Sequence, residues 1–132
     1  MSQENVDLVL GAYDRFNAGE RTPELWFWHR HAAYQAARED PDSAVHQGID
    51  AIRKQFASWT DAYPDLRVEP LDARANQDQV FLWVRFTGHG AASGAPLAME
   101  LAHVYTVRDG KATRCVEYFD RDEALEAVGL SE

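Results

Sequence analysis

Apolar residues recur every three or four positions near the start of the chain, with polar residues between them. This spacing predicts an amphipathic helix that has Ser2 as its N-cap. The Asn-Ala-Gly sequence at residues 17–19 marks its end, because Asn and Gly tolerate the left-handed backbone conformation. The apolar positions of this helix are Val6, Val9, Leu10, Tyr13 and Phe16.

Two further helices are predicted before residue 65. The first starts at residues 22–24 (TPE), which combine a capping hydroxyl, a proline suited to the first helical position and an acid near the positive helix end. Its apolar residues 25–28 indicate a short helix that is buried or covers a cavity. The other begins at Gly48 and is ended by Pro64. Its apolar positions are Ile49, Ile52, Phe56, Trp59 and Tyr63.

The pattern then changes to period two, which is typical of strands. Residues 80–84 are continuously apolar, which indicates a central strand covered on both faces, and Asp120 is the expected cap of a closing helix that ends at Gly129. These elements indicate an α+β fold, in which N-terminal helices pack on a curved, mainly antiparallel sheet and a short C-terminal helix follows. A long helix across such a sheet leaves an interior too wide for side chains to fill, where ligands bind. Strands are predicted at residues 33–38, 66–74, 79–88, 97–107 and 112–120.

The last two predicted strands carry a histidine and an acid on a face that is otherwise apolar. Residues 108–110 (RDG) suit a three-residue hairpin loop, with glycine in the left-handed position. That loop pairs His103 with Cys115 and Leu101 with Glu117. His103 and Glu117 are then expected as diagonal neighbours on one face, within reach of each other.

Length and charge narrow the class of protein. The 132 residues suit one domain over residues 1–132, and no apolar run or leader-like start is present, so we expect a cytoplasmic protein. A single cysteine excludes an internal disulfide. The net charge of −9 argues against nucleic acid and against an anionic membrane surface as partners. His29 and His31 lack a third ligand at metal spacing, so no metal site is expected.

With these elements in place, the chain resembles the SnoaL-like branch of the nuclear-transport-factor-2-like (NTF2-like) superfamily. The residues that carry the resemblance are 17–20 (NAGE), 45–52 (VHQGIDAI) and 103–130 (HVYTVRDGKATRCVEYFDRDEALEAVGL). The resemblance covers nearly the whole chain and implies a cone-shaped α+β barrel. The superfamily includes polyketide cyclases, ketosteroid isomerases, epoxide hydrolases, dehydratases and members without catalysis, so the residues must decide the reaction.

The functional residues of two of these groups, the ketosteroid isomerases and the epoxide hydrolases, match this chain poorly. The isomerase tyrosine, general base and protonated aspartic acid correspond to Ala12, Ala36 and either Ala102 or His103. Tyr34 and Glu117 match the tyrosine and one acid of limonene-type epoxide hydrolases. However, Ala36 replaces the asparagine of that group, and residues 84–86 lack its Arg-x-Asp element.

The SnoaL-type cyclases match best. A histidine on the penultimate strand and an aspartate on the last strand line the pocket of that group, and His103 and Glu117 stand at the corresponding positions. Ring closure needs a base beside a carbonyl and an acid for the developing alkoxide, and a carboxylate in a dry pocket has a raised pKa. We therefore expect Glu117 and His103 as catalytic base and acid. The alternative is a buried Glu117 that hydrogen-bonds His103 or a backbone amide and only steadies the sheet.

Other residues are candidates for the cavity wall. Tyrosines 13, 34 and 105 either donate hydrogen bonds to a substrate carbonyl or are amphipathic core residues. Cys115 is expected as a buried filler and not a nucleophile, since no cation is predicted beside it. The residues expected to bind substrate are Tyr13, Phe16, Trp28, Tyr34, Phe56, Trp59, Met99, Leu101 and Phe119.

Two classes of function follow. The first is a cofactor-free acid–base enzyme of cyclase or isomerase type that acts on a small apolar carbonyl compound. The second is a non-catalytic module that binds a lipophilic ligand or has a filled interior. By resemblance, a homodimer that pairs through the outer face of the sheet is expected.

Overall fold

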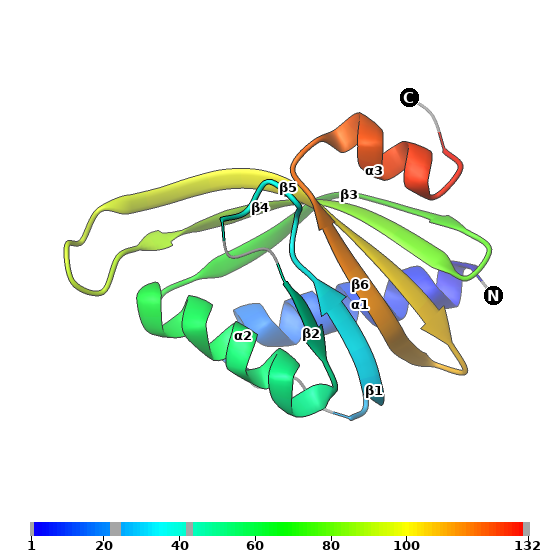
Figure 1. Ribbon diagram of the computed structural model, residues 1–132, viewed down its shortest axis with the longest axis horizontal. Coiled ribbons are helices and arrows are strands. Elements are labelled where there is room, and N and C mark those ends of the chain that lie inside the picture. The colour runs from blue at the N-terminus through cyan, green and yellow to red at the C-terminus, as the bar shows by residue number, and fades with distance from the viewer. Residues whose placement is uncertain (1, 22–24, 42–43, 131–132) are drawn as a thin grey trace.

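The computed structural model describes residues 2–21, 25–41 and 44–130, which form three helices and six strands (Figure 1). The amphipathic patterns predicted the first long helix and the helix after Gly48 correctly, and the expected cap at Asp120 predicted the terminal helix correctly. The elements are α1 (Ser2–Asn17), β1 (Trp28–Gln35), β2 (Val45–Gln47), α2 (Ile49–Ala62), β3 (Arg67–Asn76), β4 (Gln79–His89), β5 (Pro96–Arg108), β6 (Lys111–Tyr118) and α3 (Arg121–Ala127).

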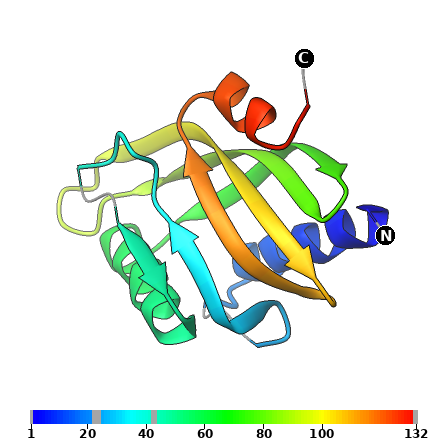
Figure 2. The same ribbon diagram turned by 45° about the vertical axis from the view of Figure 1, so that its right-hand side comes forward.

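The six strands form one curved, unclosed sheet in the order β2-β1-β6-β5-β4-β3. Only the pairing of β1 with β6 is parallel among these strands. Helices α1 and α2 lie along the concave side, with α1 against β3 and β4 and α2 against β1 and β2 (Figures 1 and 2). The α+β class with a mainly antiparallel sheet is therefore confirmed.

Strand β4 is covered on both faces, as its continuous apolar run predicted, although it lies next to the edge strand β3 and not at the centre of the sheet. Val80, Leu82 and Val84 belong to the core between the sheet and α1. Phe81 faces the opposite side and is fully buried in a second cluster. Helix α3 closes that cluster with Leu125, and it begins at Asp120, whose side chain accepts the backbone N–H groups of residues 122 and 123.

The short helix predicted over residues 22–28 is wrong at the positions that the structure describes. Residues 25–27 form a turn, and Trp28 is the first residue of β1. The backbone carbonyl of Phe27 accepts the N–H of Ala112 at 2.7 Å, so pairing with β6 extends the strand to this point. Residues 22–24 lie outside the described residues. Strand β1 consequently starts before the predicted residue 33, and β2 was not predicted.

The three-residue hairpin loop between β5 and β6 is also wrong. Arg108 pairs with Lys111, so the turn has two residues, Asp109 and Gly110, with φ of 52° and 77°. A β-bulge then places one extra residue, Thr113, on β6. This extra residue shifts the register by one.

The shifted register changes which side chains meet. His103 lies directly opposite Glu117, and Tyr105 lies opposite Cys115. The predicted pairs, His103 with Cys115 and Leu101 with Glu117, do not form. The histidine and the acid are thus closer neighbours than the diagonal arrangement that the sequence indicated.

No helix in the described ranges has both the length and the apolar character needed to cross a membrane. The termini of the described chain lie near the same end of the sheet (Figure 1). The helices α1 and α2 and the concave face of the sheet together define where a ligand cavity forms.

Candidate functional site

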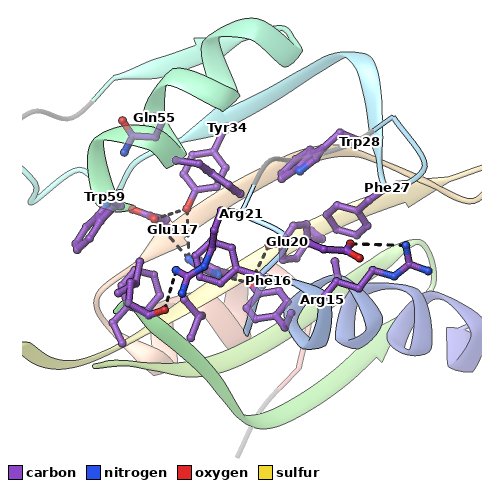
Figure 3. A pocket seen from close by; sticks show the side chains of 18 of the residues that line it. Arg15, Phe16, Glu20, Arg21, Phe27, Trp28, Tyr34, Gln55, Trp59 and Glu117 are labelled. Atoms are coloured by element: carbon purple, nitrogen blue, oxygen red, sulfur yellow. Dashed lines mark hydrogen bonds and ion pairs between the residues drawn. The ribbon is translucent and has the colours of Figure 1, made fainter. Parts of the chain in front are cut away.

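A cavity of about 100 Å³ lies between α1, α2 and the concave face of the sheet. Its wall is mostly apolar and aromatic, with polar groups at two places. One is a buried group of side chains from β1, β5, β6 and α1, and the other is a charged rim formed by residues 15–21 (Figure 3). The lining residues are Ala12, Tyr13, Arg15, Phe16, Glu20, Arg21, Trp26, Phe27, Trp28, Tyr34, Gln55, Phe56, Trp59, Leu66, Val68, Phe86, His103, Tyr105 and Glu117.

His103 and Glu117 form the buried polar centre of this cavity. They are 4% and 5% exposed, and no other aspartate, glutamate, lysine, arginine or histidine is buried in the described part of the chain. The Nε2 atom of His103 lies 3.4 Å from Oε2 of Glu117. A buried acid and a buried imidazole in contact are an arrangement suited to proton transfer.

Three tyrosine hydroxyls extend this centre into a network. Tyr34 donates a hydrogen bond to Oε2 of Glu117, and its hydroxyl lies 3.4 Å from Nε2 of His103 (Figure 3). The Tyr13 hydroxyl hydrogen-bonds Nδ1 of His103 and lies 2.8 Å from the Tyr105 hydroxyl. A continuous path of hydrogen bonds therefore runs from Tyr105 through Tyr13 and His103 to Glu117.

The pKa of Glu117 is set by opposing effects. Burial raises this pKa, but hydrogen bonds from His103 and Tyr34, the charge of His103 and the backbone N–H of Ala37 together outweigh burial, so the pKa falls below its ordinary value. The expectation of a raised pKa is therefore wrong. Glu117 is a carboxylate at neutral pH because its hydrogen-bond donors stabilise the charged form.

The tyrosines keep their protons. Burial raises the pKa of Tyr13, Tyr34 and Tyr105 well above the ordinary value, and the charge of Glu117 adds to this effect for Tyr34. Each is a neutral hydroxyl at neutral pH, able to donate a hydrogen bond. Burial, with the charge of Glu117, also raises the pKa of the Cys115 thiol well above its usual value, so this residue is a protonated filler.

Several residues predicted to bind substrate come together at the cavity. Those that line it are Tyr13, Phe16, Trp28, Tyr34, Phe56 and Trp59. Met99, Leu101 and Phe119 do not. Leu101 is buried in the core, Met99 packs against that core from a half-buried position, and Phe119 is 37% exposed beyond the end of β6.

Other lining residues were missed. Phe86 shares a strand face with Val84 by alternation, so the period-two pattern could have placed it there. Arg15, Glu20 and Arg21 carry no such signal, because they lie at and after the end of α1, where side-chain direction depends on the turn. Their position is a property of the tertiary structure.

The described residues contain no group of histidine, cysteine or acidic side chains that is arranged to hold a metal ion. His29 and His31 lie on β1 with exposed side chains, and the ring centroids are 5.8 Å apart. They take no part in the cavity.

A family model described as a SnoaL-like domain matches residues 9–115. The chain belongs to the SnoaL-like family. This family is part of the NTF2-like superfamily, whose ketosteroid isomerase-like fold the SnoaL-like chain shares. A comparison with curated protein sequences found no match.

Solved structures give the same fold. A protein provisionally assigned as a SnoaL-like polyketide cyclase from Jannaschia sp. CCS1 is 19% identical, with a TM-score of 0.77 over 100% of this chain and 96% of that chain. A protein from Catenulispora acidiphila in complex with trimethylamine is 19% identical, with a TM-score of 0.72 over 92% of each chain. TerC, co-crystallised with polyporic acid, is 20% identical, with a TM-score of 0.75 over 95% of this chain and 97% of that chain.

Proposed function

We propose that this SnoaL-like chain is a cofactor-free acid–base enzyme of cyclase or isomerase type that acts on a small apolar carbonyl compound. The observation that carries the proposal is the contact between His103 and Glu117 at the base of an apolar cavity, 3.4 Å apart and both buried. Two structural relatives were crystallised with small organic molecules, which supports a ligand in this cavity.

In the proposed reaction Glu117 removes a proton from the carbon next to the carbonyl. Because its pKa is lowered, the carboxylate is the populated form at neutral pH, and its modest basicity must be matched by activation of the substrate. Neutral tyrosine hydroxyls supply that activation, since a hydrogen bond to the carbonyl oxygen stabilises the enolate that forms. Tyr13 lines the cavity beside the pair and is placed for this role, while the single hydroxyl proton of Tyr34 is donated to Glu117 and holds the base in position.

His103 completes the proton path. It contacts Glu117 through Nε2 and Tyr13 through Nδ1, so a proton taken by the carboxylate can pass along hydrogen bonds and return to the product. In a substrate whose enolate is conjugated with a double bond, the proton then returns to another carbon, as in an isomerase. Otherwise the α-carbon of the enolate attacks a second carbonyl, whose oxygen takes up the proton, as in an aldol cyclase. Both outcomes use the same base.

The first step can be tested without knowledge of the natural substrate. We expect the protein in D₂O to accelerate exchange of the α-protons of 2-tetralone, followed by ¹H NMR, by about 10²-fold or more over buffer. Glu117→Gln should abolish the acceleration. Glu100→Gln is the matched control, because Glu100 is an exposed carboxylate that pairs with Arg85 at 2.8 Å and does not line the cavity.

A second candidate function is a non-catalytic ligand-binding module. It is favoured by the observation that no buried side-chain polar atom in the described residues lacks a hydrogen-bond partner, so the polar centre is satisfied without a ligand. Binding of 2-tetralone without exchange in the native protein would support this candidate against catalysis. Exchange that persists at the native rate in Glu117→Gln would show that another group is the base.

A further inference from the structure

The rim of the cavity carries one positive charge that no carboxylate in the described residues balances. Arg15, Glu20 and Arg21 all line the cavity. Arg15 pairs with Glu20 at 3.9 Å and stacks on Trp26, with its guanidinium carbon 4.4 Å from the ring centroid. Arg21 forms no such ion pair within the described ranges, so the rim has a net positive charge although the whole chain carries −9.

The guanidinium of Arg21 is held in a defined orientation. Its carbon lies 4.7 Å from the centroid of the Phe16 ring, and Nη1 donates to the backbone carbonyl of Leu66 at 3.0 Å. In Figure 3 the side chain lies between Phe16 and the pair formed by Tyr34 and Glu117. One hydrogen bond uses one of the five N–H donors of a guanidinium, and stacking on a ring leaves the donor edges free.

We propose that Arg21 recognises a carboxylate on the ligand, and that the site therefore takes an apolar, ring-bearing acid. Arginine presents parallel N–H groups that match the two oxygens of a carboxylate, and an apolar wall strengthens the contact. The aromatic residues Trp28, Phe56 and Trp59 provide flat surfaces for the rings of such a ligand. This inference rests on the proposed function, because it names the class of molecule that occupies the same cavity.

The charges also determine the orientation of the bound ligand. Glu117 is an anion at the base, so a ligand carboxylate is repelled from that end and attracted to Arg21 at the rim. The uncharged end, which carries the carbonyl, then faces the tyrosine hydroxyls. Glu20 does not cancel the attraction at the rim, because Arg15 is its partner.

The test compares two probes of nearly the same shape, of which only one is charged. Isothermal titration calorimetry measures the affinity of the native protein for 2-naphthoate and for 2-naphthamide, with the expected preference for the carboxylate. Arg21→Met should weaken 2-naphthoate binding by about tenfold and change 2-naphthamide binding by less than about twofold. Arg21→Lys, which keeps the charge, should retain part of the preference.

Arg67→Met is the matched control. It removes the same charge from an exposed position on β3, next to the inward-facing Val68, and should leave both affinities unchanged. In the native protein the 2-naphthoate affinity should also fall as salt rises, while the 2-naphthamide affinity stays constant, a readout that needs no variant.

The outcomes separate the two proposals. Equal binding of both probes, or a preference that survives in Arg21→Met, overturns carboxylate recognition and leaves the proposed function standing. Failure of the native protein to bind either probe overturns both. A salt-independent affinity for 2-naphthoate also contradicts the role of Arg21.

Discussion

His103 and Glu117 face each other directly across β5 and β6, with Nε2 and Oε2 3.4 Å apart, because a β-bulge puts one extra residue on β6. Without Thr113 as the extra residue, the register would pair His103 with Val116, whose side chain points to the other face of the sheet. A single residue in the hairpin therefore determines whether the polar centre forms. The two-residue turn that precedes the bulge helps to set the same register.

The turn requires a residue that accepts positive φ. Gly110 has φ of 77°, and a Cβ there would meet no atom within 4 Å, so Gly110→Ala should destabilise the protein by about 1 kcal/mol through backbone strain alone. Gly11→Ala is the contrasting variant, since its Cβ also meets nothing but the position is helical, and it should stabilise by about 0.5–1 kcal/mol. Urea unfolding measures both. Equal effects of the two variants would contradict the role of the turn conformation.

Tyr34 should control the ionisation of Glu117. Its hydroxyl donates to the carboxylate and lowers the pKa of Glu117, so Tyr34→Phe should raise that pKa. Tyr105→Phe is the matched control, because the Tyr105 hydroxyl is also buried in this network but hydrogen-bonds Tyr13 and not Glu117. The side-chain carboxyl ¹³C shift of labelled Glu117, followed against pH, gives the pKa in each protein. An unchanged pKa of Glu117 in Tyr34→Phe would show that His103 and the Ala37 amide are sufficient to lower this pKa.

The same carboxylate should make folding stability depend on pH in acid. The pKa of Glu117 is lowered in the folded protein from an ordinary 4.5, so the unfolded chain takes up the proton first as pH falls. The resulting stabilisation is fully present above pH 4.5 and is lost as pH falls through the folded-state pKa.

Thermal unfolding from pH 7 to pH 3 tests this dependence. The difference in stability between the native protein and Glu117→Gln should be constant near neutral pH. Below about pH 4.5 the native protein should lose stability relative to the variant. Glu100→Gln, at an exposed carboxylate whose pKa is also lowered, shows how much of the slope comes from the surface. A Glu117→Gln variant with the native pH profile would contradict the assignment.

Cys115 should be unreactive in the folded state. It is fully buried and its pKa is raised, so neither access nor thiolate supports reaction with 5,5′-dithiobis(2-nitrobenzoate). We expect labelling at least about 10²-fold slower in buffer than in denaturing urea, in line with the free energy of opening a buried site. Rapid labelling in buffer would show that the interior beside Glu117 opens readily.

Local periodicity was enough to predict most of the elements. The spacing of apolar residues in α1, α2 and β3 to β6 reflects a face that must be buried, and that face can be recognised from neighbouring residues alone. Asp120 indicated its helix for the same reason, since a cap acts on residues two and three positions away. Residues 25–28 were misassigned because a short apolar run is compatible with either state, and pairing with β6 decided it.

The candidate site was likewise predictable from the sequence only in part. A histidine and an acid on a strand face that is otherwise apolar can be recognised in the sequence. His103 and Glu117 could therefore be predicted as site residues from the sequence alone. Their direct contact depended on a bulge, which the residue types of the hairpin do not specify. The hydroxyls of Tyr13 and Tyr34 join them from segments 90 and 83 residues away along the chain.

The sequence by itself therefore determined the class of fold, the inward faces of its elements and the two polar residues at its centre, because burial of an apolar face leaves a periodic pattern in the chain. Only the tertiary structure decided that the pKa of Glu117 falls rather than rises, since that depends on donors from β1, β5 and the backbone of Ala37. It also decided that Arg21 lies at the rim of the cavity without a carboxylate partner among the described residues. Contacts between distant segments depend on how the buried faces pack together, and the local pattern of apolar residues does not specify them.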